Sequence, residues 1–157
     1  MAGVQQLEIR RTGYLEPIAR ALVDAAMVDL AVRYGSGDDT PVDATEFAPP
    51  DGDFVVAFLD GVPVGCGGWR SYHADPSTAE IKRMFTRAEA RRCGVGRAVL
   101  RAVEESARAA GRARVALETG KLQPEAIAMY EAAGYQRIPN FGYYRDEPGA
   151  MSYGRQL

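Results

Sequence analysis

The 157-residue sequence contains few of the side chains that build metal sites or disulfide frameworks. It has two cysteines, Cys66 and Cys93, and a single histidine, His73. A closed zinc site needs four ligands, so these three side chains could not complete one without carboxylates. Two isolated cysteines do not indicate a disulfide framework either. We therefore expect no bound metal and no requirement for an oxidising compartment.

Long apolar runs and a basic excess are also absent. No stretch approaches the roughly 20 apolar residues that span a bilayer, and residues 1–11 are too polar for a signal peptide. The net charge is −2, whereas a dedicated nucleic-acid binder usually carries a positive excess. We expect a cytoplasmic protein with neither a membrane nor a nucleic acid as partner. The length favours a single domain over residues 1–157.

The pattern of apolar residues predicts a mixed α/β chain. Short β-prone runs indicate strands, and longer helical patterns bounded by Pro or Gly indicate helices. Asp60-Gly61 lies between two such runs and predicts a hairpin with a type I′ turn. Residues 35–51 are rich in Gly, Ser, Asp and Pro and predict a long loop. The expected strands are 7–10, 54–59, 62–66, 79–86, 115–118, 135–138 and 151–156, and the expected helices are 16–32, 94–110 and 124–133.

The segment Arg-Arg-Cys-Gly-Val-Gly at residues 91–96 stands between an expected strand and an expected helix. The first N–H groups of a helix have no partner within it, and glycine lets a phosphate approach the backbone closely. Residues 82–101 contain seven basic side chains and one acidic one, although the whole chain is acidic. A P-loop is excluded because Lys121 is not followed by Ser or Thr. A dinucleotide-binding fingerprint would need a small residue where Val99 stands.

These residues resemble the GNAT superfamily of N-acetyltransferases. Arg91-x-x-Gly94-x-Gly96 is similar to its (Gln/Arg)-x-x-Gly-x-(Gly/Ala) motif. Residues 80–86 resemble its fourth strand, and residues 118–120 and 126–135 resemble its fifth strand and following helix. The resemblance is specific over residues 54–135. It implies a single α/β domain with a mixed, mostly antiparallel central sheet and helices on both faces. A parallel βαβ coenzyme-binding unit would occupy about residues 79–135, with a splay between the fourth and fifth strands that the sequence itself does not show.

The same resemblance implies an acyltransferase that moves an acetyl group from acetyl-coenzyme A to a primary amine by direct attack. Thr86 and Cys93 depart from the residues more usual in the family, and Gln123 stands where many members have asparagine. The residues that the resemblance places against coenzyme A are Met84, Phe85, Thr86, Arg91, Arg92, Cys93, Gly94, Val95, Gly96, Arg97, Gln123 and Tyr130.

Two side chains are candidates for proton transfer. Tyr130 could serve as general acid, because a phenol still carries its proton at pH 7; the alternative is a half-buried helix tyrosine. Glu80, directly or through ordered water, could be the base; the alternative is a carboxylate paired with a nearby arginine. Glu118 and His73 are further candidates for the base. Cys93 is not expected to be a nucleophile, because direct attack by the amine needs no covalent intermediate.

The acceptor side is expected where acidic and aromatic residues gather, a combination that suits a cationic amine. Ordinary solvated loop charges and core aromatics are the alternative interpretation. The acceptor could be a small-molecule amine or a protein lysine or N-terminus, and a homodimer is compatible with the resemblance. A non-catalytic acyl-coenzyme A-binding sensor remains the alternative function, although such a binder would need neither Tyr130 nor Glu80. The candidate acceptor residues are Tyr34, Trp69, Tyr72, Glu118 and Tyr143, with Asp38, Asp39, Asp43, Glu46, Phe47 and residues 141–144 as wider members of the set.

Overall fold

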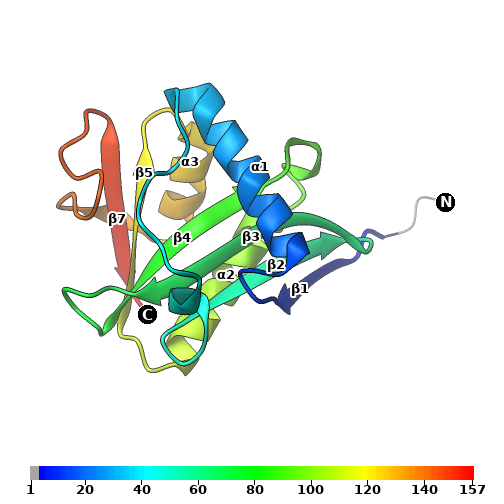
Figure 1. Cartoon of the computed structure of the whole chain (residues 1–157), viewed down its shortest axis with the longest axis horizontal. Coiled ribbons are helices and arrows are strands. Elements are labelled where there is room, and N and C mark those ends of the chain that lie inside the picture. The colour runs from blue at the N-terminus through cyan, green and yellow to red at the C-terminus, as the bar shows by residue number, and fades with distance from the viewer. Residues whose placement is uncertain (1–3) are drawn as a thin grey trace.

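The computed structural model describes residues 4–157 and contains one seven-stranded sheet in the order β1-β2-β3-β4-β5-β7-β6 (Figure 1). Only β4 and β5 pair in parallel; the other neighbours are antiparallel. The expected mixed, mostly antiparallel sheet is therefore confirmed. The strands are β1 (Leu7–Arg11), β2 (Gly52–Leu59), β3 (Val62–Ser71), β4 (Thr78–Thr86), β5 (Arg114–Gly120), β6 (Gln136–Ile138) and β7 (Ala150–Gln156).

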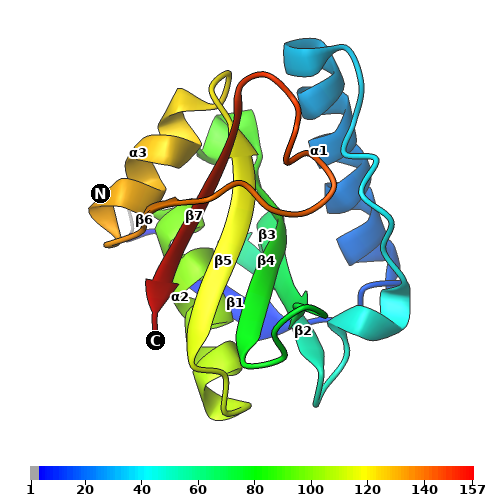
Figure 2. The ribbon, with the colours of Figure 1, turned by 90° about the vertical axis from the view of Figure 1, so that its left-hand side faces the viewer.

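Helices cover both faces of the sheet. Figure 2 shows α1 (Pro17–Tyr34) on one side and α2 (Val95–Ala109) and α3 (Pro124–Ala132) on the other. Two short 3₁₀ helices, η1 (Ala44–Phe47) and η2 (Ala88–Ala90), complete the elements. Within residues 4–157, no helix combines the length and apolarity needed to cross a membrane.

Strand β2 supplies both hydrophobic cores through the alternation of its side chains. Phe54, Val56 and Phe58 pack into the cluster beneath α1. Val55 and Ala57 point the other way and join the larger cluster that contains Val99 of α2. A continuous apolar run therefore forms one strand that is buried on both faces, as its composition predicts.

The hairpin between β2 and β3 confirms the turn predicted from Asp60-Gly61. Both residues have positive φ, 51° and 81°, as a type I′ turn requires. Strand β3 continues to Ser71, five residues beyond the expected end. The glycines at 67 and 68 hid this extension, because glycine is a poor strand former in isolation. The long loop contains η1, which Asp43 caps by accepting a hydrogen bond from the Thr45 N–H (2.9 Å).

Strands β4 and β5 separate halfway along their length. Their parallel pairing runs from Thr78 opposite Arg114 to Ile81 opposite Leu117 and then stops. Beyond that point β4 continues to Thr86 and β5 to Gly120 without pairing to each other. The pairing of β4 with β3 is also irregular there, and Arg83 has a φ of 63°. This splay, which the sequence could not show, positions the candidate site.

Candidate active site

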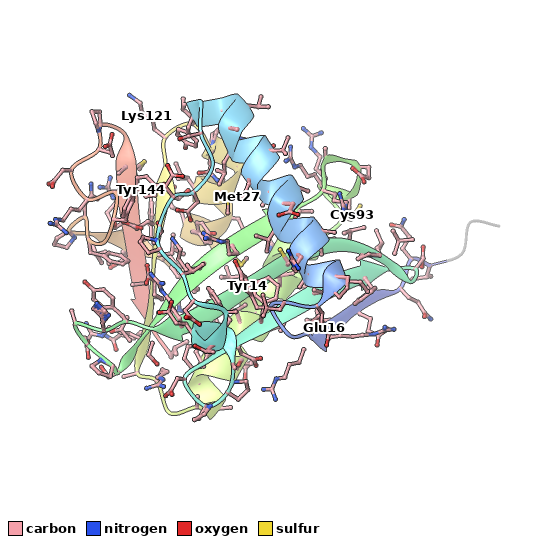
Figure 3. The ribbon with its side chains drawn as sticks, in the orientation of Figure 1. Tyr14, Glu16, Met27, Cys93, Lys121 and Tyr144 are labelled. Atoms are coloured by element: carbon pink, nitrogen blue, oxygen red, sulfur yellow. The ribbon has the colours of Figure 1, made fainter. Side chains whose placement is uncertain are left out.

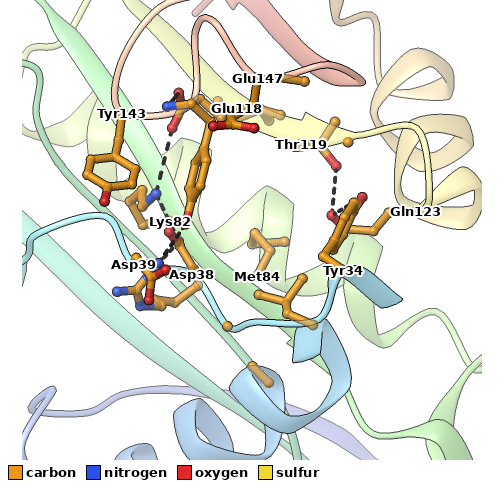
Figure 4. Close-up of a pocket in the computed structure, with 18 of the residues that line it drawn as sticks. Tyr34, Asp38, Asp39, Lys82, Met84, Glu118, Thr119, Gln123, Tyr143 and Glu147 are labelled. Atoms are coloured by element: carbon orange, nitrogen blue, oxygen red, sulfur yellow. Dashed lines mark hydrogen bonds and ion pairs between the residues drawn. The ribbon is translucent and has the colours of Figure 1, made fainter. Parts of the chain in front are cut away.

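A cavity of about 560 Å³ opens where β4 and β5 separate (Figure 4). Residues 81–85 of β4 and 117–120 of β5 form two of its walls. The C-terminal half of α1 and residues 36–39 form another, and residues 143, 144 and 147–150 close the remaining side. Because the inner edges of both strands lack a strand partner here, their backbone N–H and C=O groups are available to a ligand.

The loop before α2 is arranged to receive an anion. Gly94 has a φ of 79° and caps α2 without a side-chain hydrogen bond. The first helical bond runs from the Ala98 N–H to the Gly94 carbonyl (3.1 Å), so the N–H groups of residues 95–97 precede it. Such unpaired N–H groups at the positive end of a helix bind phosphate.

Gly96 has a second role in packing. A Cβ at this position would lie 2.9 Å from Met129 Sδ of α3. Cys93 is exposed on the loop that precedes α2 (Figure 3). Residues 91–97 do not line the cavity itself, so the structure separates the expected phosphate loop from the expected chemistry.

A chain of ion pairs connects this loop to both neighbouring helices. Arg91 Nη2 lies 3.4 Å from Asp29 Oδ1 of α1, and Asp29 Oδ2 also accepts a hydrogen bond from Arg33 Nε (3.1 Å). Arg33 in turn pairs with Glu125 at the start of α3 (2.5 Å). Asp29 lines the cavity, so the loop before α2 and the cavity wall share one carboxylate.

Tyr130 lines the cavity from α3, with only 5% of its surface exposed. Burial raises the pKa of its phenol, so the side chain holds its proton throughout the neutral range. Its ring lies 5.6 Å from that of Tyr135, and the Tyr135 hydroxyl donates to Glu104 Oε2 (2.7 Å). These contacts fix the position of Tyr130 behind the splay.

Glu118 projects from β5 just beyond the point where pairing with β4 ends, and its side chain is 6% exposed. Oε1 accepts a hydrogen bond from the Tyr144 N–H (3.2 Å). Oε2 is buried and has no hydrogen-bond partner within residues 4–157; Lys82 Nζ lies 4.0 Å away. Burial raises the pKa of Glu118 in spite of the opposing effects of Lys82 and the Tyr144 N–H. The site therefore contains a buried carboxylate that is more basic than usual and has one unused oxygen.

Lys82 and Arg83, the two basic side chains that line the cavity, both pair with Asp38. Lys82 Nζ lies 3.1 Å from Asp38 Oδ2 and donates to the Thr40 hydroxyl (3.3 Å). Arg83 also pairs with Asp38. Burial alone would raise the pKa of Asp38, but the neighbouring cations and the Thr40 hydroxyl lower it to about 2. Asp38 is therefore ionised at any pH at which an amine acceptor could react.

Glu80 lies outside the cavity, although the sequence analysis named it as the first candidate for the base. It is 4% exposed and accepts a hydrogen bond from Arg70 Nε (2.9 Å). Arg70 also reaches the Pro41 carbonyl (2.9 Å) and Glu46. Glu80 lies two residues before Lys82 on β4. Through its bonds to Pro41 and Glu46, Arg70 connects Glu80 to the loop at residues 41–46. Its surroundings match the alternative interpretation of a carboxylate paired with an arginine.

Two of the expected acceptor residues also lie elsewhere. Trp69 is 1% exposed, and its Nε1 donates to Ser106 Oγ of α2 (3.0 Å), on the opposite face of the sheet. The Tyr72 ring contacts Phe141 edge-on at 5.2 Å and does not line the cavity. His73 is exposed in the same turn.

The cavity lining includes ten of the residues predicted from the sequence for the coenzyme or the acceptor. Thr86 and residues 91–97 lie outside the lining, whereas Lys82 and Glu147 line the cavity and were not predicted. Lys82 could have been noticed as a charged residue inside a strand, whereas Glu147 lies in a tail without a recognisable pattern. The ten are Tyr34, Asp38, Asp39, Met84, Phe85, Glu118, Gln123, Tyr130, Tyr143 and Tyr144.

Comparison with known proteins identifies the class. The profile of the Acetyltransferase (GNAT) family matches residues 18–135, so the chain belongs to this family and is an acyltransferase. It is 34% identical over 149 residues to a protein of Azospirillum brasilense named IAA acetyltransferase, covering 95% of this chain and 97% of that one.

Solved structures agree on the fold. A structure from Klebsiella pneumoniae superimposes with a TM-score of 0.79 at 25% identity, covering 96% of this chain and 97% of the other. The PaiA N-acetyltransferase of Thermoplasma acidophilum, solved with coenzyme A, gives a TM-score of 0.71 at 15% identity and covers 97% of this chain and 99% of that one. At that identity the second likeness shows the fold alone.

Proposed function

We propose that this chain transfers an acetyl group from acetyl-coenzyme A to a primary amine by direct attack, with Glu118 as the base and Tyr130 as the acid. The observation that carries the proposal is the placement of both side chains on one cavity at the splay. Glu118 offers an oxygen without a hydrogen-bond donor and with a raised pKa, and Tyr130 offers a phenol that keeps its proton. One group can accept a proton and the other carries one to donate, as the base and acid roles require.

The residues present fit coenzyme A. The N–H groups of residues 95–97 and the side chains of Arg91, Arg92 and Arg97 would hold its phosphates. The backbone of residues 84–86, unpaired on the β5 side, would bind the pantetheine arm. When bound, acetyl-coenzyme A supplies the thioester carbon that the amine nitrogen attacks and the thiolate that leaves.

Glu118 prepares the acceptor for attack. An alkylamine has a pKa of about 10.4, so at neutral pH it enters as an ammonium ion that cannot react. Oε2 can accept one of its protons without first giving up a hydrogen bond, because that oxygen has none. The raised pKa of Glu118 reduces the energetic gap for this transfer.

Tyr130 supplies a proton at the end of the reaction. Its hydroxyl would donate to the departing sulfur, and burial excludes water that could replace it. The phenolate would then recover a proton from solvent entering the cavity as the products leave. Glu118 thus removes the proton that the amine loses, and Tyr130 supplies the proton that the leaving thiolate gains.

A paired comparison of two glutamate variants tests the assignment of the base. In Glu118→Gln, kcat/KM should fall by about 100-fold or more. The loss of activity toward acid pH that the parent shows through the Glu118 pKa should disappear. Isothermal titration with coenzyme A should show nearly unchanged affinity.

Glu80→Gln is the matched control. It breaks the pair with Arg70 and should lower thermal stability without changing the shape of the pH profile. The assignment would be contradicted if the acid limb survived in Glu118→Gln and vanished in Glu80→Gln.

A further inference from the structure

The cavity wall carries more carboxylates than basic side chains. Five carboxylates line it, against the two cations Lys82 and Arg83. Both cations pair with Asp38, and Asp29 is paired with arginines outside the lining. Asp39 and Glu147 therefore remain without an ion pair within residues 4–157, and Glu118 has only the long contact with Lys82 at 4.0 Å.

These three carboxylates differ in depth. Glu118 is buried, with Oε2 unpartnered at the splay. Asp39 and Glu147 are exposed to solvent, and the mouth denotes this solvent-facing part of the lining. Tyr143, 55% exposed, also lines the cavity, and Figure 4 shows Tyr143 and Asp39 on the side of the cavity opposite Tyr34 and Gln123. The cavity thus has an inner anionic position next to the chemistry and two exposed carboxylates in the outer part of its lining.

We propose that the preferred acceptor is a small dication, a diamine or polyamine, rather than a monoamine or an amino acid. This rests on the proposed function and specifies its substrate class. One amino group meets Glu118, gives up a proton and is acetylated. The other stays charged at the mouth, where ion pairing with Asp39 or Glu147 and cation–π attraction to Tyr143 favour it.

The same lining disfavours an acceptor that carries a carboxylate. Lys82 and Arg83 are the cations available inside the described cavity, and Asp38 already binds both. A substrate carboxylate would have to displace Asp38 or face Asp39 and Glu147 at the mouth. An amino acid would therefore bind less well than an amine of the same length.

Three amines of matched length test the inference: butylamine, 1,4-diaminobutane and 4-aminobutanoate. With acetyl-coenzyme A at low ionic strength, kcat/KM for the diamine should exceed that for the monoamine by about tenfold. The aminobutanoate should rank last. The preference should shrink as salt rises, because exposed charges are screened. A monoamine rate that equals or exceeds the diamine rate would overturn the inference, and so would a preference for the aminobutanoate.

Variants at the mouth identify the source of the preference. In the double variant Asp39→Asn, Glu147→Gln, the ratio of diamine to monoamine kcat/KM should fall toward one. Asp146→Asn is the matched control, since Asp146 lies beside Glu147, is 92% exposed and does not line the cavity. It should leave the ratio unchanged. Melting temperature and coenzyme A affinity report whether each variant remains folded.

The outcomes separate this inference from the function on which it rests. If butylamine is acetylated without a preference for the diamine, or if the preference survives in the double variant, only the inference of a dicationic acceptor is overturned. Failure to acetylate any of the amines while coenzyme A still binds overturns the proposed function as well.

Discussion

Replacing Glu118 with glutamine should make the protein more stable at alkaline pH while impairing its chemistry. The ionised carboxylate has a buried oxygen without a hydrogen-bond donor, a situation that costs about 1–3 kcal/mol. Lys82 at 4.0 Å offsets part of that cost. We therefore expect glutamine, which resembles the protonated acid, to stabilise the fold by about 1 kcal/mol at pH 8.

The sign of the pH dependence follows from the pKa shift. Burial raises the pKa of Glu118 in the folded protein, whereas in the unfolded chain it lies near its ordinary value of about 4.3. The contribution of Glu118 to stability is therefore fully present below that value and is lost as pH rises through the folded pKa. Glutamine does not titrate, so the variant and the parent should diverge as pH increases.

Thermal melting of both proteins at pH 4 and pH 8 measures this divergence. For a protein of this size, about 1 kcal/mol corresponds to roughly 2–4 °C in Tm. The Tm of Glu118→Gln should exceed that of the parent by about this amount at pH 8, with a smaller difference at pH 4. The account of Glu118 as an unsatisfied buried carboxylate would be refuted by equal Tm differences at both pH values. It would also be refuted if the parent were more stable than Glu118→Gln at pH 8.

Three further predictions concern the acid, the phosphate loop and the packing of α2. Tyr130→Phe should lower kcat by about 100-fold and leave coenzyme A affinity nearly unchanged by titration; an unaltered kcat would remove Tyr130 as the acid. Asp29→Asn frees Arg91 from its ion pair and should tighten coenzyme A binding by about two- to threefold, with weaker binding as the contrary result. Gly96→Ala would place a Cβ 2.9 Å from Met129 Sδ, near the end of a flexible side chain. Because alanine favours a helix over glycine by about 0.5–1 kcal/mol, the free energy of unfolding in urea should change by less than about 1 kcal/mol. A loss of more than about 3 kcal/mol would show that Met129 cannot move.

The fold was largely predictable because its signals are local. The apolar run of β2, the Asp60-Gly61 turn and the glycine-bounded helix α2 each depend on a few adjacent residues. The extent of β3 was missed because its second half passes through two glycines. Local pattern therefore predicted the elements well, and their ends less well.

The different surroundings of Glu80 and Glu118 could not be predicted from sequence. Both are glutamates on neighbouring parallel strands, and Glu80 lies opposite Ala116, two residues before Glu118. The difference arises because the strands part after Ile81 and Leu117, which leaves Glu118 at the opening. Glu80 instead remains in the paired region, bound to Arg70. Both facts depend on long-range packing, which the sequence pattern does not encode.

The most direct test of the central claim is a single-turnover reaction of the parent protein with acetyl-coenzyme A and 1,4-diaminobutane at pH 8. Free thiol and N-acetylated amine should form together in equal amounts, with the acetyl group on nitrogen by mass spectrometry and no acetylated protein intermediate. An acetyl group retained on the protein would contradict direct transfer in this cavity, and so would coenzyme A binding without acetylation of either 1,4-diaminobutane or butylamine.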